Sequence, residues 1–208
     1  MSKFIVVEGL DGTGKTTQIK ILAKYLEDKG ESVEITAEPT SHPTGKLIRR
    51  ILSGEVPATP WSLAALFLSD RIVHNTSTED GIEKMMAEGK TVISDRYYYS
   101  TFAYQGHETD LDWAIKMHAD CPEIRRPDLV LFLTMSPEKC VERIRANRPD
   151  EAIEIYENVE SLTKISRKFD AVFHELKDSE NIVYIDADGT IEEVSARLFD
   201  AVDKAFGE

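Results

Sequence analysis

The sequence predicts an α/β fold of three layers, in which a five-stranded parallel sheet is flanked by helices. Short apolar runs rich in β-branched residues recur along the chain, as buried parallel strands do: 4–7, 33–37, 91–94, 129–134 and 182–185. Segments with apolar residues at helical spacing separate these runs, an alternation typical of right-handed crossovers. Because the 208 residues contain no repeat or linker, we expect a single domain over 1–208.

A glycine-rich loop follows the first strand. Its residues match the pattern G-x-x-x-x-G-K-[ST]: Gly9, Leu10, Asp11, Gly12, Thr13, Gly14, Lys15, Thr16 and Thr17. Apolar residues at helical spacing over 19–26 place a helix directly after it. Strand, loop and helix in this order predict a P-loop fold, in which backbone N–H groups at the helix N-terminus bind phosphate. Lys15 then reaches the β- and γ-phosphates of a nucleoside triphosphate, and the Thr16 hydroxyl ligates Mg²⁺.

A loop is predicted after the second strand, because residues 38–43 include two prolines and several turn-forming residues. We expect Thr44 to cap the helix that follows, whose apolar side carries residues 47, 48, 51 and 52. Arg49 lies near the polar side of this helix, where a basic residue is most often simply solvated.

A further helix is expected to start around Trp61. It carries Phe67 and Arg71 four residues apart, and therefore on one face. This pair is able to hold a base and a phosphate, although a core phenylalanine beside a surface ion pair is the more common arrangement. Residues 80–88 predict another helix, which Gly89 ends.

Asp95 and Arg96 stand at the C-terminal end of the third strand. Ligands of open α/β sheets bind at that edge, so position favours function over a structural ion pair. Asp95 is expected to ligate Mg²⁺ directly or through water, and Arg96 to bind a phosphate. The aromatic segment 97–104 belongs to the core or lines the pocket. Asp128 precedes the fourth strand, and so lies at the wrong edge for a metal.

The helix that begins at Ser136-Pro137 carries Arg143, Arg145 and, near its end, Arg148. A phosphate-binding cluster and a solvated helix end both fit this pattern. A helix is expected over 110–119. Apolar residues at helical spacing predict two further helices, a core helix over 159–176 and a last helix over 191–206 that Thr190 caps.

The net charge of -13 argues against a nucleic-acid partner and against docking on anionic lipid. No run of 18 apolar residues and no signal-peptide core occur, so we expect a cytoplasmic protein without a membrane partner. Cys121 and Cys140 lack metal-like spacing, and no disulfide is expected. Cys140, in a predicted helix, is interpreted as a small buried hydrophobe.

Several of these motifs stand in an order that resembles the thymidylate kinase family of P-loop nucleoside monophosphate kinases. The matching segments are the loop 9–17, Glu38-Pro39, Phe67 with Asp70-Arg71, Asp95-Arg96-Tyr97, and an arginine-rich segment ending near Tyr156-Glu157-Asn158. The resemblance covers essentially the whole chain. It implies transfer of a phosphoryl group from ATP-Mg²⁺ to dTMP, giving dTDP for dTTP synthesis, by a homodimer.

The resemblance also implies a dTMP site, with these residues: Asp11, Glu38, Pro39, Arg49, Phe67, Arg71, Arg96, Thr101 and Tyr104. Phe67 resembles the ring that stacks on thymine, and Arg71 its hydrogen-bonding neighbour on the base. Thr101 falls where family members place a polar group against the base edge. Tyr104 falls where an aromatic ring crowds the sugar 2′ position and favours deoxyribose.

The phosphates are bound by other residues in the family pattern. Arg49 and Arg96 resemble the arginines at the acceptor phosphate. Asp11 resembles a loop carboxylate that contacts the sugar 3′-hydroxyl or orients the phosphate region. Arg143 resembles a lid arginine packed on adenine, which the turn 186–190 would flank.

Two positions depart from some members of the family. Members with a basic residue inside the phosphate loop carry it at the position of Gly12. This chain therefore resembles the class whose lid, here about 143–157, supplies the catalytic arginines. Arg145 and Arg148, three residues apart, share a helical face and are expected to reach the phosphates. With Lys15, Arg96 and Asp11 they form the catalytic set that the resemblance implies. The stretch 39–43 lacks the double glycine common in bacterial members.

Two other functions remain open from the sequence. A related kinase acting on another nucleotide or on a deoxynucleoside has the same general pattern. A GTP-hydrolysing switch would share the loop, but such proteins usually carry Asn-Lys-x-Asp after a late strand. Residues 186–189 are Asp-Ala-Asp-Gly, which does not match.

Overall fold

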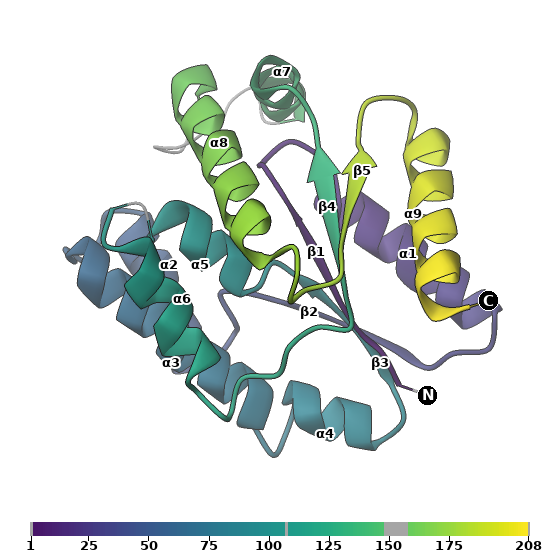
Figure 1. Ribbon diagram of the computed structural model, residues 1–208, viewed down its shortest axis with the longest axis horizontal. Helices are drawn as coiled ribbons and strands as arrows, with labels where there is room; N and C mark the ends of the chain where they lie inside the picture. Colours follow the sequence, from purple (N-terminus) through teal and green to yellow (C-terminus); the bar gives the residue numbers. More distant parts are fainter. Residues whose placement is uncertain (1, 107, 148–157, 208) are drawn as a thin grey trace.

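The computed structural model describes residues 2–106, 108–147 and 158–207. Its centre is a five-stranded sheet with helices on both faces (Figure 1). The strands are β1 (Phe4–Gly9), β2 (Val33–Ala37), β3 (Thr91–Asp95), β4 (Leu129–Thr134) and β5 (Ile182–Asp186). They pair in the order β2-β3-β1-β4-β5, and every pairing is parallel. The predicted α/β class, five parallel strands and strand positions are confirmed.

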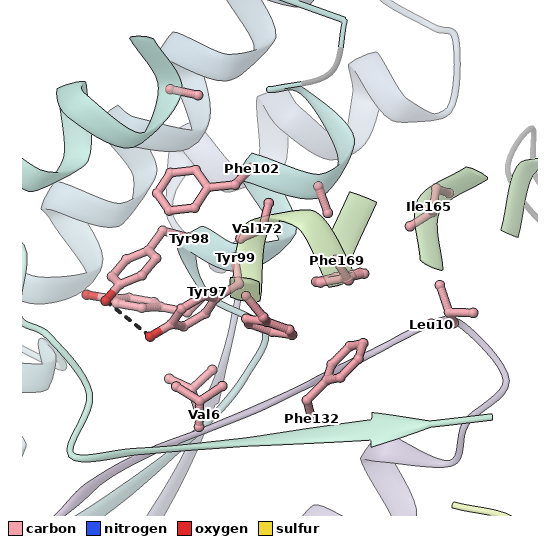
Figure 2. Packing of buried hydrophobic residues seen from close by; sticks show 14 of the residues in the cluster. Val6, Leu10, Tyr97, Tyr98, Tyr99, Phe102, Phe132, Ile165, Phe169 and Val172 are labelled. Carbon is pink, nitrogen blue, oxygen red and sulfur yellow. Dashed lines mark hydrogen bonds between the residues drawn. The ribbon is translucent and has the colours of Figure 1, made fainter. Parts of the chain in front are cut away.

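The two faces of the sheet carry separate cores, because successive side chains of a strand point to opposite sides. Ile5 and Val7 pack on one face with α1 (Lys15–Asp28) and α9 (Ile191–Phe206). On the other face a larger and strongly aromatic cluster brings together residues from α4 (Ile82–Ala87), α5 (Tyr98–Tyr104), α7 (Pro137–Asn147) and α8 (Val159–Leu176). Figure 2 shows Tyr97, Tyr99, Phe132 and Phe169 packed in this cluster.

Three helices remain, and in the view of Figure 1 they lie farther from the sheet than α5 does. They are α2 (Pro43–Leu52), α3 (Pro60–Thr76) and α6 (Leu111–Ala119). The predicted N-cap of α2 is wrong. His42 occupies the N-cap, because the fixed φ of Pro43 suits the first helical position. Thr44 lies inside the helix, and its hydroxyl donates to Asp70 Oδ1 at 2.7 Å.

Local signals elsewhere located the element ends well. Thr190 caps α9 with a reciprocal pair of hydrogen bonds to Glu193, as predicted for its N-cap.

Three other residues were placed from the sequence. The Asp128 carboxylate accepts from the Phe4 N–H at 2.7 Å, at the edge of the sheet away from the phosphate loop. Cys140 is buried in α7, as predicted. Val159 is exposed, since it is the first residue of α8, although its spacing placed it with the core residues.

Within the described ranges, no helix is both long enough and apolar enough to cross a bilayer.

Candidate active site

Three cavities open along the carboxyl edge of the sheet, and two of them share the side chains of Asp11 and Arg96. The larger, of about 690 Å³, lies over the phosphate loop and reaches Arg143 and residues 189–191. The smaller, of about 190 Å³, lies between Phe67, Arg71, Tyr104 and Gln105. Asp11 and Arg96 line both cavities, so the two spaces meet at these side chains.

Glycines and Lys15 shape the phosphate loop. Gly12 and Gly14 have φ of 87° and 93°, values that L-residues with a side chain rarely adopt. A Cβ at position 12 would stand 2.4 Å from the Cys140 carbonyl oxygen, so α7 packs directly on the loop backbone. Lys15 is buried, and its ammonium donates to the carbonyls of Gly9 and Leu10 at 3.0 Å each. Burial, together with the nearby charge of Arg96, lowers the pKa of Lys15 below its ordinary value.

The structure brings together the two residues predicted to bind a metal. The Thr16 hydroxyl donates to Asp95 Oδ2 at 3.2 Å, at the rim of the larger cavity. Both offer the hard oxygen atoms that Mg²⁺ prefers. Among the described residues, no group of three or more His, Cys, Asp or Glu side chains is arranged to hold a metal ion. The pair therefore fits a Mg²⁺ that is held mainly by substrate phosphates and water.

Arg96 links the two cavities. It is the non-glycine residue with positive φ in the described chain, at 71°, which turns its side chain back over the end of β1. Its guanidinium donates to Asp11 Oδ1 at 2.5 Å and to the Ser100 hydroxyl at 2.9 Å. Although burial acts in the opposite direction, the charges of Arg96 and Lys15 lower the pKa of Asp11 to about 2. Asp11 is therefore ionised and pairs with both cations of the site.

The Glu8 carboxylate lies close to the Arg96 guanidinium. This role of Glu8 was not predicted from the sequence. Its carboxylate is completely buried and accepts from the Tyr97 N–H, the Ser100 N–H and the Ser100 hydroxyl, at 2.8–3.1 Å. Its nearer oxygen lies 3.9 Å from Arg96 Nη1. Burial raises the pKa of Glu8, and the charge of Arg96 opposes that rise. Glu8 thus joins the end of β1 to the start of α5.

Arg71 lies at the back of the smaller cavity, with 1% of its surface exposed. Nε and Nη2 both donate to Glu38 Oε2, at 2.9 and 2.5 Å. Nη2 also donates to the Thr101 hydroxyl at 3.2 Å, and Nη1 to His118 Nε2 at 2.5 Å. A buried charge of this kind is tolerated because hydrogen bonds and an opposite charge surround it.

Glu38 is itself held on its other side. His74 Nδ1 lies 2.9 Å from Glu38 Oε1, and its Nε2 lies 2.7 Å from the Thr36 hydroxyl. The loop that follows Glu38 is anchored by Asp70, whose buried carboxylate accepts from the Thr40 N–H at 2.8 Å and the Thr40 hydroxyl at 2.6 Å. These contacts fix the loop 38–43, whose geometry the sequence left undetermined.

Of the other residues predicted to bind dTMP, some line the smaller cavity and some do not. Phe67, Pro39 and Tyr104 line the smaller cavity, and the Tyr104 ring lies 5.7 Å from the Arg96 guanidinium. Thr101 is buried behind Arg71 and does not line the cavity. Arg49 points to a neighbouring space, where its guanidinium donates to the carbonyls of Thr40 and Pro39.

The predicted lid is described only in part. Arg143 lines the larger cavity, and its Nη2 donates to the Gly189 carbonyl at 3.4 Å, so the residue lies beside the turn predicted to flank adenine. Arg145 is exposed on α7. Arg148 and the segment 148–157 lie outside the described residues.

The fold is a parallel sheet with a phosphate loop, and an acidic residue lies beside the loop threonine. A second cavity lies next to the loop. Together these features are those of a P-loop nucleotide kinase. Comparison with known proteins makes the assignment specific. The model of the thymidylate kinase family matches residues 7–198. The chain belongs to the thymidylate kinase family, whose members phosphorylate dTMP.

Individual relatives agree with this assignment. A probable thymidylate kinase of Thermococcus kodakarensis is 34% identical over 99% of both chains. One from Pyrococcus horikoshii is 44% identical over 68% of this chain and 69% of its own. A thymidylate kinase of Desulfotalea psychrophila is 38% identical over 82% of this chain and 81% of its own. The predicted family and enzyme class are confirmed.

Proposed function

We propose that the protein transfers the γ-phosphoryl group of ATP to dTMP across the boundary between the two cavities. The observation that carries this proposal is that Asp11 and Arg96 line both spaces. ATP in the larger cavity and dTMP in the smaller would bring donor and acceptor phosphates together beside Arg96. The acceptor phosphate is already ionised, so the reaction needs positioning and charge neutralisation rather than a strong base.

Both substrates are anions, and the protein itself carries a net charge of -13. Positive charge must therefore be concentrated where the phosphates meet. Lys15, which is buried, and Arg96, whose side chain is 18% exposed, supply two cations at the boundary. Nucleotide phosphates would replace the Gly9 and Leu10 carbonyls as acceptors for Lys15. Held in place before the reaction, these groups would stabilise the charge that spreads over the transferred phosphoryl group.

Mg²⁺, when bound, neutralises the β- and γ-phosphates and orients them. Thr16 and Asp95 are the residues of this chain that would hold it, since their oxygens already lie 3.2 Å apart at the cavity rim. Asp95 would act directly or through water.

The lid arginines complete the proposed donor site. Arg143, beside the Gly189 carbonyl, would pack on adenine. Arg145 and Arg148 would approach the phosphates when the segment of about 143–157 covers them, as the resemblance implies. Arg49 would exchange the Pro39 and Thr40 carbonyls for the acceptor phosphate.

ADP release measured in a coupled assay, with and without an acceptor, tests the proposed reaction. We expect release that depends on dTMP and on Mg²⁺, and a panel of dTMP, dUMP, dCMP, dAMP, dGMP and thymidine in which dTMP gives the highest kcat/KM. A nucleotide-hydrolysing switch would release the diphosphate equally well without acceptor. A deoxynucleoside kinase would prefer thymidine over dTMP.

We also propose that the chain acts as one domain, in the cytoplasm and as a homodimer. The family resemblance supports these assignments. On the surface, Trp61 is 48% exposed and packs on Trp113 with ring centroids 4.9 Å apart, which offers an apolar patch on α3 and α6 to a second copy. Sedimentation equilibrium of the purified protein tests the dimer, and a monomer at micromolar concentration would contradict it.

A further inference from the structure

The buried Arg71 side chain has five N–H groups, and the structure pairs four of them. Glu38 accepts two, Thr101 accepts one and His118 accepts one. One N–H on Nη1 has no hydrogen-bond partner within the part of the chain that the structure describes. Since Arg71 lines the smaller cavity, this N–H is available to a base bound there.

His118 approaches Arg71 from α6 as a hydrogen-bond acceptor. Its Nδ1 lies 2.8 Å from the Ala114 carbonyl, which can only accept, so Nδ1 carries the proton. Nε2 therefore presents a lone pair to Arg71 Nη1 at 2.5 Å. Burial and the charge of Arg71 lower the pKa of His118 to about 3, in agreement with a neutral ring.

The His118 ring packs against aromatic side chains and borders a further cavity of about 200 Å³. It is 4% exposed, and Phe102 packs edge-on against it with ring centroids 5.1 Å apart. The centroid of the Tyr98 ring lies 6.1 Å from that of His118, and Tyr98 belongs with Phe102 to the aromatic cluster seen in Figure 2. His118 does not line the smaller cavity, so any effect on the substrate passes through Arg71.

We propose that His118 is a positioning residue for base recognition, which holds Arg71 Nη1 so that its remaining N–H donates to a pyrimidine with a carbonyl at position 4. This inference rests on the proposed dTMP site and assigns a role to a residue outside it. Thymine and uracil have an acceptor at position 4. Cytosine has an amino group there, which would meet an N–H donor and leave both groups unpaired.

Two substitutions at position 118 separate this role from simple packing. In His118→Gln the side-chain oxygen reaches the former Nε2 position, and so can still accept from Arg71. In His118→Asn the shorter amide keeps the bond to the Ala114 carbonyl but does not reach Arg71. Both variants remove the aromatic ring, so loss of packing affects them alike.

Steady-state kinetics and direct dTMP binding by calorimetry read out the difference. We expect His118→Asn to raise KM and Kd for dTMP about tenfold, the order expected for one hydrogen bond to a charged group, while KM for ATP stays constant. His118→Gln should stay within about threefold of the parent. The preference for dTMP over dCMP should fall in His118→Asn and survive in His118→Gln. Equal losses in the two variants, or no loss in either, would overturn the proposal.

A measurement on the parent protein covers the case in which a variant does not fold. Long-range ¹H–¹⁵N spectra of the imidazoles at pH 7 should show His118 as the neutral Nδ1–H tautomer, with its Nε2 resonance shifting when dTMP binds. A protonated Nε2, or no change on binding, would contradict the inference. If the parent fails to phosphorylate dTMP, the proposed reaction is wrong, whereas a parent with normal turnover and equal variants rejects only the role of His118.

Discussion

The phosphate loop and the smaller cavity differ in the groups that they present to a ligand. The loop is one continuous stretch, 9–17, and presents mainly backbone groups that its glycines allow to turn inward. The smaller cavity, which we propose to hold dTMP and call the acceptor cavity, is built from side chains of distant elements, including Glu38, Arg71 and Arg96. Its polar groups are buried and bonded to one another. The loop can therefore lose a side chain and stay folded, whereas the cavity depends on a network in which each group satisfies another.

This difference predicts that substitutions among the hydrogen-bonded side chains of the acceptor cavity first lower the stability of the fold. Arg71→Met leaves the Glu38 carboxylate buried without its ion-pair partner. We expect the free energy of unfolding to fall by about 3–5 kcal/mol, the usual cost of removing one member of a buried pair. Urea denaturation at pH 7 measures it.

The double variant Glu38→Gln/Arg71→Met provides the control. Because it removes both charges, it should recover more than half of the loss. If Arg71→Met costs less than about 1 kcal/mol, the network contributes less to stability than its geometry indicates.

In the phosphate loop, removal of a charged side chain should lower activity rather than stability. Lys15→Ala removes a preorganised cation from the reacting phosphates, and we expect kcat to fall by roughly 10²- to 10³-fold. The unfolding midpoint should stay close to that of the parent. Lys24, exposed on the same helix and paired with Asp28, gives a matched control, since Lys24→Ala should leave kcat unchanged. Near-normal turnover of Lys15→Ala would rule out the donor-site assignment.

Phe67 tests whether the cavity binds the base by stacking. Phe67→Ala should raise KM for dTMP roughly tenfold or more, since stacking on an aromatic ring is worth about 1–3 kcal/mol. KM for ATP should not change. Phe199 stacks on Tyr25 with centroids 3.9 Å apart on the other face of the sheet, so Phe199→Ala should lower stability without changing either KM. An equal rise in both KM values for Phe67→Ala would mean that the ring serves only packing.

The smallest effect on stability is expected at Asp11, which lines both cavities. The folded-state pKa of Asp11, about 2, lies below the ordinary aspartate value, so its ionised form stabilises the fold above about pH 4. That contribution is lost as the pH falls towards 2. Because the side chain is 39% exposed, solvent screens it, and we expect less than about 1 kcal/mol. Stability measured between pH 5 and 3 should depend less steeply on pH in Asp11→Asn, and identical slopes would contradict this.

The sequence predicts the two regions unequally, for the same physical reason that they differ. Residues 9–17 can be assigned from local pattern, and β4 was predicted with its observed bounds. His118 carries no local sign of its role, because its partner Arg71 lies on another helix. Glu8 precedes the loop in sequence, yet its importance comes from Ser100 and Tyr97, brought to it by the parallel pairing of β1 and β3. Thr44 shows the reverse error, a suitable capping residue displaced by the proline before it.

The close contact between Gly12 and the Cys140 carbonyl also bears on how this loop could have evolved. Members of the family that carry a basic residue at this position need room for a side chain. Here φ is 87°, and any Cβ would stand 2.4 Å from a backbone oxygen that cannot swing aside as a side chain can. Gly12→Arg alone would therefore disturb α7 before it added a useful charge. A chain with this backbone could therefore take a basic residue at position 12 only after α7 had shifted away from the loop.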